Sequence, residues 1–293
     1  MPRCVRSWIA EFFTVCYKDI ENSRGCKSGM FGGFTGSKTP TGTDWGEQML
    51  NTVASKTIRH LFTQSESVEV SVRCYPSSKL LQGSIDSLKM NGRGLVIRQQ
   101  FRTEELSFET DAISLDFSSV LKGQMNIKQP TQAIAQVVLT EEDINNSFKA
   151  ELVRKRLENI TSPALSELSG GEPISFTEVQ VTLQPNNQLR LFAKANLPVQ
   201  GLVPISMTST LAVERRRRVL FQNSQFEPED IPESLRETSQ KLATALDEIL
   251  NNMVDLDRFN LDGVTLRINR LETHGKKLIF SGYAQIERVP NTP

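Results

Sequence analysis

The sequence predicts an α+β fold in which antiparallel strands pack against long amphipathic helices. Apolar residues recur at every second position over much of 67–139 and 179–213, which is typical of half-buried strands. They recur at steps of three and four within 44–64 and 232–256, which is typical of helices with one apolar side. The connections between successive strands are short, so neighbouring strands are expected to be antiparallel.

Composition and charge narrow the class of protein. The chain has 293 residues with 34 Lys+Arg and 34 Asp+Glu, and this balance argues against a general nucleic-acid binder. A hydrophobic fraction of 38% is compatible with a folded core in one large domain or two medium ones. No apolar run approaches the roughly 20 residues that a membrane-spanning helix needs. The composition therefore predicts a soluble body that would meet a membrane only at its surface.

Residues 1–43 differ from the rest and are predicted to form a flexible N-terminal extension. The apolar stretch 8–17 follows two arginines, as in a signal peptide, but it is only about ten residues long and contains Glu11. A short interfacial helix is an alternative. Met30 opens a Gly-rich segment and is a candidate start of translation. Because no convincing signal peptide is present, the chain is expected in the cytoplasm or on the cytoplasmic face of a membrane.

A single domain is predicted over 44–290, and it begins with a helix at 44–64. Asp44 followed by Glu47 gives this helix a start that resembles a capping box. Several strands follow, each with apolar residues on one side. The alternating residues are Val68, Val70, Val72 and Cys74; Leu106 and Phe108; Ile113, Leu115 and Phe117; and Ala133, Ala135, Val137 and Leu139.

A second helical stretch is predicted over 140–160, where Thr140 and Asp143 give another capping signal. The segment 162–173, rich in Ser, Gly and Pro, ends it and is the strongest internal boundary. This boundary separates either two similar halves or two layers of one domain.

The second half repeats the scheme with a longer strand and a longer helix. Residues 203–213 alternate along one continuous apolar face, which needs an equally long partner. The helix predicted over 232–256 provides that partner. Two last strands are predicted at 264–271 and 277–287.

The four consecutive arginines, Arg215, Arg216, Arg217 and Arg218, are the one strong charge feature. They follow the long strand and are predicted to continue it, so that Arg215 and Arg217 would share the side of Val213. One interpretation is a solvated strand end or a sheet edge protected from aggregation by charge. The other is attraction to the phosphate groups of anionic lipids.

Groups for catalysis or metal binding are scarce. The chain has two histidines, His60 and His274, and four scattered cysteines, without the spacing of a zinc site or a disulfide framework. The common nucleotide-binding and hydrolase motifs are missing from the sequence. A hydrolase needs a base beside its nucleophile, and both histidines look structural or solvent-exposed. The sequence therefore predicts a protein that is not an enzyme and uses no cofactor or metal.

Several short elements together resemble the LmeA-like phospholipid-binding family, and most closely its cyanobacterial branch. These elements are Leu81-Gln82-Gly83, Gly92 with Gly94-Leu95, Leu121-Lys122-Gly123, and Leu139-Thr140-Glu141. The resemblance covers roughly residues 44–290. It implies a long, curved antiparallel sheet wrapped around long amphipathic helices, similar to the tubular lipid-binding (BPI-like) superfamily, with an apolar groove between helix and sheet.

The resemblance also implies a function. The protein is expected to bind a phospholipid or another lipid without catalysis, to hold acyl chains in the groove, and to serve in lipid transfer or membrane-envelope maintenance. The candidate groove residues are Leu95, Ile97, Leu189, Leu191, Val203, Ile205 and Met207. The run Arg215–Arg218 is the candidate for contact with a headgroup or an anionic membrane. An alternative is a scaffold or assembly factor that binds a membrane protein complex through a sheet edge and holds no lipid.

Overall fold

A computed structural model of the chain describes residues 62–97, 100–114, 127–161, 163–198, 200–253, 255–258 and 264–287, together with residues 51, 55, 58 and 59. The predicted extension at 1–43 and most of the predicted helix at 44–64 lie outside this part of the chain. So do Leu115, Phe117 and the element Leu121-Lys122-Gly123.

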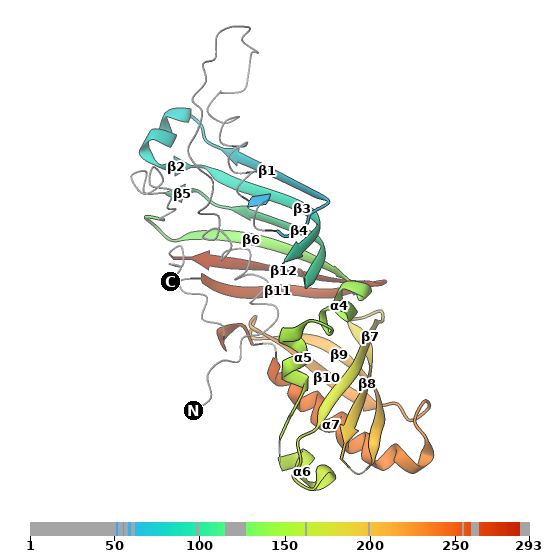
Figure 1. Ribbon diagram of the computed structural model, residues 1–293. Coiled ribbons are helices and arrows are strands. Elements are labelled where there is room, and N and C mark those ends of the chain that lie inside the picture. The colour runs from blue at the N-terminus through green and yellow to red at the C-terminus, as the bar shows by residue number, and fades with distance from the viewer. Residues whose placement is uncertain are drawn as a thin grey trace, which may run out of the picture.

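The larger of two main sheets has six antiparallel strands in the order β1-β3-β4-β6-β12-β11 (Figure 1). Its strands are β1 (Ser67–Arg73), β3 (Ser87–Ile97), β4 (Phe101–Thr110), β6 (Thr131–Thr140), β11 (Val264–His274) and β12 (Lys277–Ile286). The last two strands return from the far end of the sequence, and β12 pairs with β6 along its whole length. A small ribbon of β2 (Ser84–Ile85) and β5 (Ile113–Ser114) accompanies the 3-10 helix η1 (Ser77–Gln82).

The second sheet has four antiparallel strands in the order β10-β9-β8-β7. Its strands are β7 (Ser175–Leu183), β8 (Gln188–Leu197), β9 (Gly201–Glu214) and β10 (Arg218–Phe226). The helix α7 (Arg236–Met253) contacts β9 and β10, as expected from the matched apolar patterns of strand and helix. The hydroxyl of Ser239 donates to the carbonyl of Pro204 at 2.6 Å, which fixes the helix on the strand. Short 3-10 turns flank α7 at η2 (Glu233–Leu235) and η3 (Leu256–Arg258).

The helical stretch predicted over 140–160 is wrong as a single helix. It is divided into α4 (Glu141–Ser147) and α5 (Glu151–Leu157), and α6 (Pro163–Ser169) follows. The division falls where Ala150 adopts an extended backbone with φ −64° and ψ 137°. The Ser147 hydroxyl also donates to the carbonyl of Ile144 at 2.5 Å, a local bond of the kind that competes with helix continuation.

The protein is thus mostly antiparallel sheet with few helices, and the described strands form two large sheets where one long sheet was predicted. The reason lies at their junction. There, β11 does not pair with a strand of the second sheet but receives the tips of two hairpins. The amide of Ile268 in β11 donates to the carbonyl of Arg216 in the β9–β10 turn, and the hydroxyl of Thr273 donates to the carbonyl of Gln184 beside the β7–β8 turn.

Candidate functional site

The six-stranded sheet has one apolar side that extends across all its strands. Two rows of cross-strand neighbours run from β1 to β11 along this side. The first row is Val68, Gly92, Leu106, Val137, Phe280 and Leu271, and the second is Val70, Met90, Phe108, Ala135, Gly282 and Ile268. Continuous apolar rows of this kind are found where a sheet faces a core or an apolar ligand.

Part of this apolar side remains accessible. Ala135, Gly282 and Ala284, on β6 and β12, are all half-buried, and Ala135 pairs directly with Gly282. Two half-buried phenylalanines are neighbours of these residues: Phe108 pairs with Ala135 across the sheet, and Phe280 is two residues before Gly282 on β12. At Gly282 the position of a side chain is taken by the backbone carbonyl of Arg267 on β11, so the accessible apolar atoms here belong to the alanines and the phenylalanines. We call these five residues the apolar patch.

The opposite side of the same sheet is polar. One of its rows is Glu69, Asn91, Ser107, Gln136, Ser281 and Arg270. A shallow hollow of about 420 Å³ lies over β1, β3, β4 and β6 on this side and is lined mainly by hydroxyl, amide and charged groups. Cross-strand ion pairs span β3 and β4, with Lys89–Glu109 at 3.3 Å and Arg93–Glu105 at 3.7 Å. This side therefore offers solvated polar groups.

The seven predicted groove residues belong to two different sheets. Leu95 and Ile97 are on β3, while Leu189, Leu191, Val203, Ile205 and Met207 are on β8 and β9, on the face that α7 covers. All seven are at most 3% exposed and share one hydrophobic core. Their role in holding a lipid stays a prediction. Burial this complete means that a ligand would reach any of the seven only if the packing around that residue opened.

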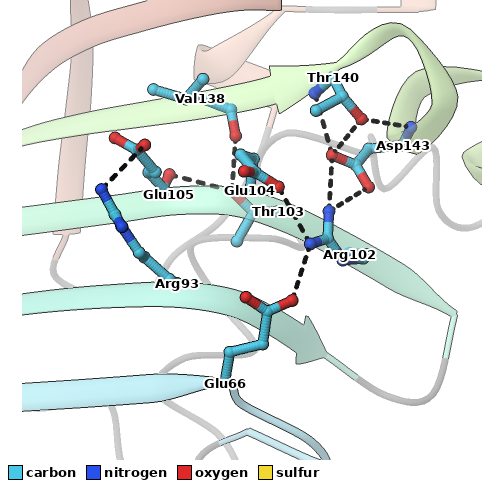
Figure 2. Close-up of polar contacts among 9 residues, drawn as sticks. All are labelled: Glu66, Arg93, Arg102, Thr103, Glu104, Glu105, Val138, Thr140 and Asp143. Carbon is cyan, nitrogen blue, oxygen red and sulfur yellow. Dashed lines mark hydrogen bonds and ion pairs between the residues drawn. The ribbon is translucent and has the colours of Figure 1, made fainter.

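A polar cluster at the end of β4 is built around Arg102 (Figure 2). One nitrogen of its guanidinium donates to both carboxylate oxygens of Asp143, at 3.0 and 3.3 Å. The other donates to Glu66 at 3.1 Å and to Glu104 at 3.0 Å. The hydrogen bond that Arg102 donates to Asp143, followed by those to Glu104 and Glu66, raises the pKa of Arg102, so the group stays charged at every accessible pH.

Asp143 serves two structures at once. Its carboxylate accepts from the backbone N–H of Thr140 at 2.9 Å and from the Thr140 hydroxyl at 2.6 Å. The Thr140 hydroxyl in turn accepts from the Asp143 N–H at 3.0 Å, which completes the capping box that the sequence predicts at the start of α4. The carboxylate is 3% exposed, so the cap and the ion pair to β4 are made in a nearly dry position.

The same short helix also reaches the second sheet. The Glu141 carboxylate accepts from the N–H of Leu183 at 2.9 Å, and the side chain of Asn145 bonds both backbone groups of Val181. Helix α4 therefore joins β4 of the larger sheet to β7 of the smaller one, and Figure 1 shows it lying between them. The sequence element Leu139-Thr140-Glu141 leads directly into this connection.

Glycine at position 94 is favoured by its backbone conformation and by its place beside the Arg102 cluster. Gly94 has φ +55°, a left-handed backbone that suits glycine. A Cβ atom there would overlap the Glu66 carboxyl group, which crosses Gly94 on its way to Arg102. The neighbouring Gly92 is also constrained, since a Cβ atom would lie 2.8 Å from the side chain of Leu95.

The arginine run does not continue the long strand, and that prediction is wrong. Arg215 and Arg216 have φ of 48° and 59°, and the N–H of Arg217 donates to the carbonyl of Glu214 at 3.0 Å. The run is therefore the tight turn between β9 and β10, with two left-handed residues in the pattern that suits the twist of a hairpin. The turn docks on β11 through the carbonyl of Arg216.

Three of the four arginine side chains have internal partners. Arg216 bonds the side chain of Asn269 and stacks on the ring of Tyr283 with 4.8 Å to the centroid. Arg217 forms an ion pair with Asp257 at 2.7 Å, and this hydrogen bond lowers the pKa of the Asp257 carboxyl.

Arg218 pairs with Glu214 at 3.0 Å and donates to the carbonyl of Asn251 at 3.2 Å. Arg215 is exposed, and its side chain has no hydrogen bond or ion pair to another described residue. A role of the run in binding headgroups stays a prediction, and it is narrowed by these contacts to the exposed members Arg215 and Arg216.

The few candidate catalytic groups do not form a cluster in the described parts of the chain. His274 is exposed at the end of β11, and its partner is Glu272 at 3.2 Å. Cys74 is buried, and its thiol donates to the carbonyl of Ser84 at 3.3 Å. His60 and the three other cysteines lie outside the described residues. Over that part of the chain, no group of three or more His, Cys, Asp or Glu side chains is arranged to hold a metal ion.

Sequence reasoning missed the apolar patch and the Arg102 cluster as sites. Phe108 and Ala135 were recognised only as strand residues, and Gly282 carries no pattern of its own. The available signal was the capping pair Thr140 and Asp143, which marks a helix start but does not identify the distant arginine.

These observations define a class: a mostly antiparallel β protein whose larger sheet has one polar and one apolar side, with part of the apolar side accessible. The chain belongs to the LmeA-like phospholipid-binding family, whose model matches residues 41–282, and this confirms the resemblance seen in the sequence. The family is one of phospholipid-binding proteins and not an enzyme family. No curated protein matches the chain, and no solved structure matches it. None of the described helices is both long enough and apolar enough to cross a membrane.

Proposed function

We propose that this chain binds the acyl chains of a phospholipid against the apolar side of its six-stranded sheet, at the apolar patch. Membership of a phospholipid-binding family supports a lipid ligand, and the apolar patch is where the described sheet combines apolar character with accessibility. Burial of each CH₂ group of an acyl chain contributes about 0.8 kcal/mol, and micromolar affinity corresponds to about 8 kcal/mol, so about ten buried methylene groups are needed in addition to those that offset the binding entropy. The single observation that carries the proposal is that Phe108, Ala135, Phe280 and Ala284 are only half-buried on the apolar side of the sheet.

In this proposal the protein acts by binding alone, in lipid transfer or in maintenance of a membrane envelope. The headgroup lies near polar or basic partners, and a peripheral contact with an anionic membrane is made by Arg215 and Arg216. The tubular arrangement implied by the family resemblance is part of the proposal, since no solved structure matches the chain.

The alternative of a scaffold that docks through a sheet edge has less support. Side chains already bond backbone groups on both outer strands of the four-stranded sheet, at Val181 on β7 and Phe221 on β10. A docking strand would have to displace them.

A matched pair of tryptophan variants tests the lipid site. Ala135→Trp places a large ring in the apolar patch, whereas Ile134→Trp places the same ring one residue away on the polar side, where Ile134 is 63% exposed. Lipid carried through purification and uptake from phospholipid vesicles are measured by native mass spectrometry. We expect Ala135→Trp to lose most of the bound lipid and Ile134→Trp to retain it. Equal lipid content in two folded variants contradicts this position for the site, and a parent chain that never carries lipid contradicts the function.

The contribution of the basic turn is tested separately by flotation with anionic vesicles. Arg215→Glu changes an exposed charge without breaking a described ion pair, so it should reduce flotation while the fold is retained. Arg217→Glu would instead break the pair with Asp257 and is not informative for this purpose. Flotation that is unchanged by Arg215→Glu assigns the turn a structural role only.

A further inference from the structure

Three Asn-Asn dipeptides occur in the chain, and in each of them the two asparagines have different surroundings in the same way. They are Asn145-Asn146 in α4, Asn186-Asn187 in the β7–β8 turn, and Asn251-Asn252 in α7. In each pair one side chain bonds the backbone of an outermost strand, while the other asparagine is exposed. The three outermost strands concerned are β7, β10 and β11.

On β7, the side-chain amide of Asn145 makes a complete pair of hydrogen bonds with Val181. The N–H of Val181 donates to Oδ1 at 2.7 Å, and Nδ2 donates to the carbonyl of Val181 at 2.9 Å. The same pattern recurs on β10. There the N–H of Phe221 donates to Oδ1 of Asn251 at 2.8 Å, and Nδ2 of Asn251 donates to the carbonyl of Phe221 at 3.1 Å.

On β11, Asn187 makes the equivalent contact across two residues. The N–H of Thr273 donates to its Oδ1 at 2.9 Å, and its Nδ2 donates to the carbonyl of Leu271 at 3.1 Å. The remaining outer strand, β1, is bonded from the segment before it, where Asn51 accepts from the N–H of Val72 at 2.5 Å and Arg59 donates to the carbonyl of Val68 at 3.3 Å.

A primary amide has one acceptor and two donors in the arrangement of a peptide group. Its two bonds to a strand therefore occupy the positions that an added strand would use. Outer strands with free N–H and C=O groups are templates for pairing with another chain, and proteins cover them to avoid association.

We propose that Asn145, Asn187 and Asn251 act as edge caps that keep the outer strands from pairing with the same strands of a second copy of this chain. The surface concerned is the outward backbone of β7, β10 and β11, and its partner, when a cap is lost, is an identical chain adding its own strand. This inference is independent of lipid binding, because none of the caps belongs to the apolar patch.

The dipeptides supply matched controls. A cap variant carries Asn145→Leu and Asn251→Leu, which remove both bonds at each edge with little change in size. A control variant carries Asn146→Leu and Asn252→Leu, where the native side chains make only local contacts, with Lys149 at 2.9 Å and with the carbonyl of Glu248 at 2.8 Å. Sedimentation velocity compares their self-association with that of the parent chain over a range of concentrations.

The cap variant should self-associate at a concentration at least tenfold lower than the parent, and the control should match the parent. Two folded variants with the same mass distribution overturn the proposal.

Hydrogen exchange in the parent chain gives a second measurement that needs no variant to fold. The Val181 and Phe221 amides should exchange at least tenfold more slowly than an unprotected amide, although they point away from their own sheet. If the Val181 and Phe221 amides exchange at the rate of unprotected amides, the proposal is overturned.

Discussion

Removal of the Asp143 carboxylate should destabilise the protein more than any other loss of one acidic side chain in α4. The substitution is Asp143→Ala. It deletes the acceptor of two bonds from Thr140 and of the bidentate contact with Arg102. Because the carboxylate is 3% exposed, water cannot replace these partners without rearrangement.

The magnitude follows from two contributions. Loss of one half of the capping box costs about 1 kcal/mol. Breaking a fully buried ion pair costs about 3–5 kcal/mol. Arg102, however, is 36% exposed and keeps Glu66 and Glu104 as partners. Solvent and these two carboxylates therefore reduce the cost of losing the Arg102–Asp143 pair to about 1–2 kcal/mol. The sum is about 2–3 kcal/mol. For a domain of this size, that corresponds to a fall in Tm of about 5–10 °C.

Differential scanning calorimetry measures this directly, with Glu142→Ala as the control because Glu142 is an exposed acid in the same first turn. Asp143→Asn should fall between the two, since the amide still accepts from Thr140 but carries no charge for Arg102. A Tm for Asp143→Ala within about 2 °C of the Glu142→Ala control would refute the reasoning, because a dry, doubly used carboxylate cannot be that dispensable.

Three further outcomes are expected. Leu246→Ala should lower the free energy of unfolding in urea by about 2–5 kcal/mol, because this 1% exposed side chain of α7 leaves a cavity in the core, and a cost under about 1 kcal/mol contradicts that packing. Gly94→Ala should cost at least about 1–2 kcal/mol in the same assay, because its φ is +55° and its Cβ would overlap Glu66, so an unchanged midpoint is the contrary result. In Asp257→Asn the stability should fall less steeply on acidification than in the parent chain. The reason is that Arg217 lowers the pKa of the Asp257 carboxyl below its ordinary 3.8, so the contribution of the Asp257–Arg217 ion pair to stability is complete above about pH 4 and is lost as pH falls further. Melting curves of parent and variant that stay parallel from pH 5 to pH 2 would exclude that contribution.

The alternation of apolar residues was sufficient to predict most of the described strands. Val68 to Val72 and Ala133 to Leu139 each place their apolar residues on the side that the structure buries most. The long strand at 203–213 and the helix that covers it could be matched because their apolar stretches are of similar length. In contrast, the division into two sheets depends on which outer strands meet in space, and period two carries no such information.

The arginine turn shows why local pattern fails at a junction. Residues of one type carry no turn signal, and left-handed backbone at Arg215 and Arg216 is intrinsically unfavourable. It is maintained by partners distant in sequence, the N–H of Ile268 and the side chain of Asn269. The edge caps escaped prediction for the same reason, since the two asparagines of each dipeptide are identical until their tertiary partners are known.

A sheet offers a ligand two faces and two edges, and on the larger sheet both edges are already bonded by other residues of the chain. The β1 edge is bonded by Asn51 and Arg59, and the β11 edge by the two hairpin tips. The polar face carries cross-strand ion pairs whose charges an acyl chain would have to desolvate, at a cost of several kcal/mol. What remains is the apolar side, and this favours the apolar patch over any edge as the place for a phospholipid. The two proposals can therefore fail separately: Ala135→Trp leaves every described edge contact intact, and the cap variant leaves the apolar patch intact. A cap variant that associates yet still carries lipid would show that the edges of this fold govern association and its face governs ligand binding.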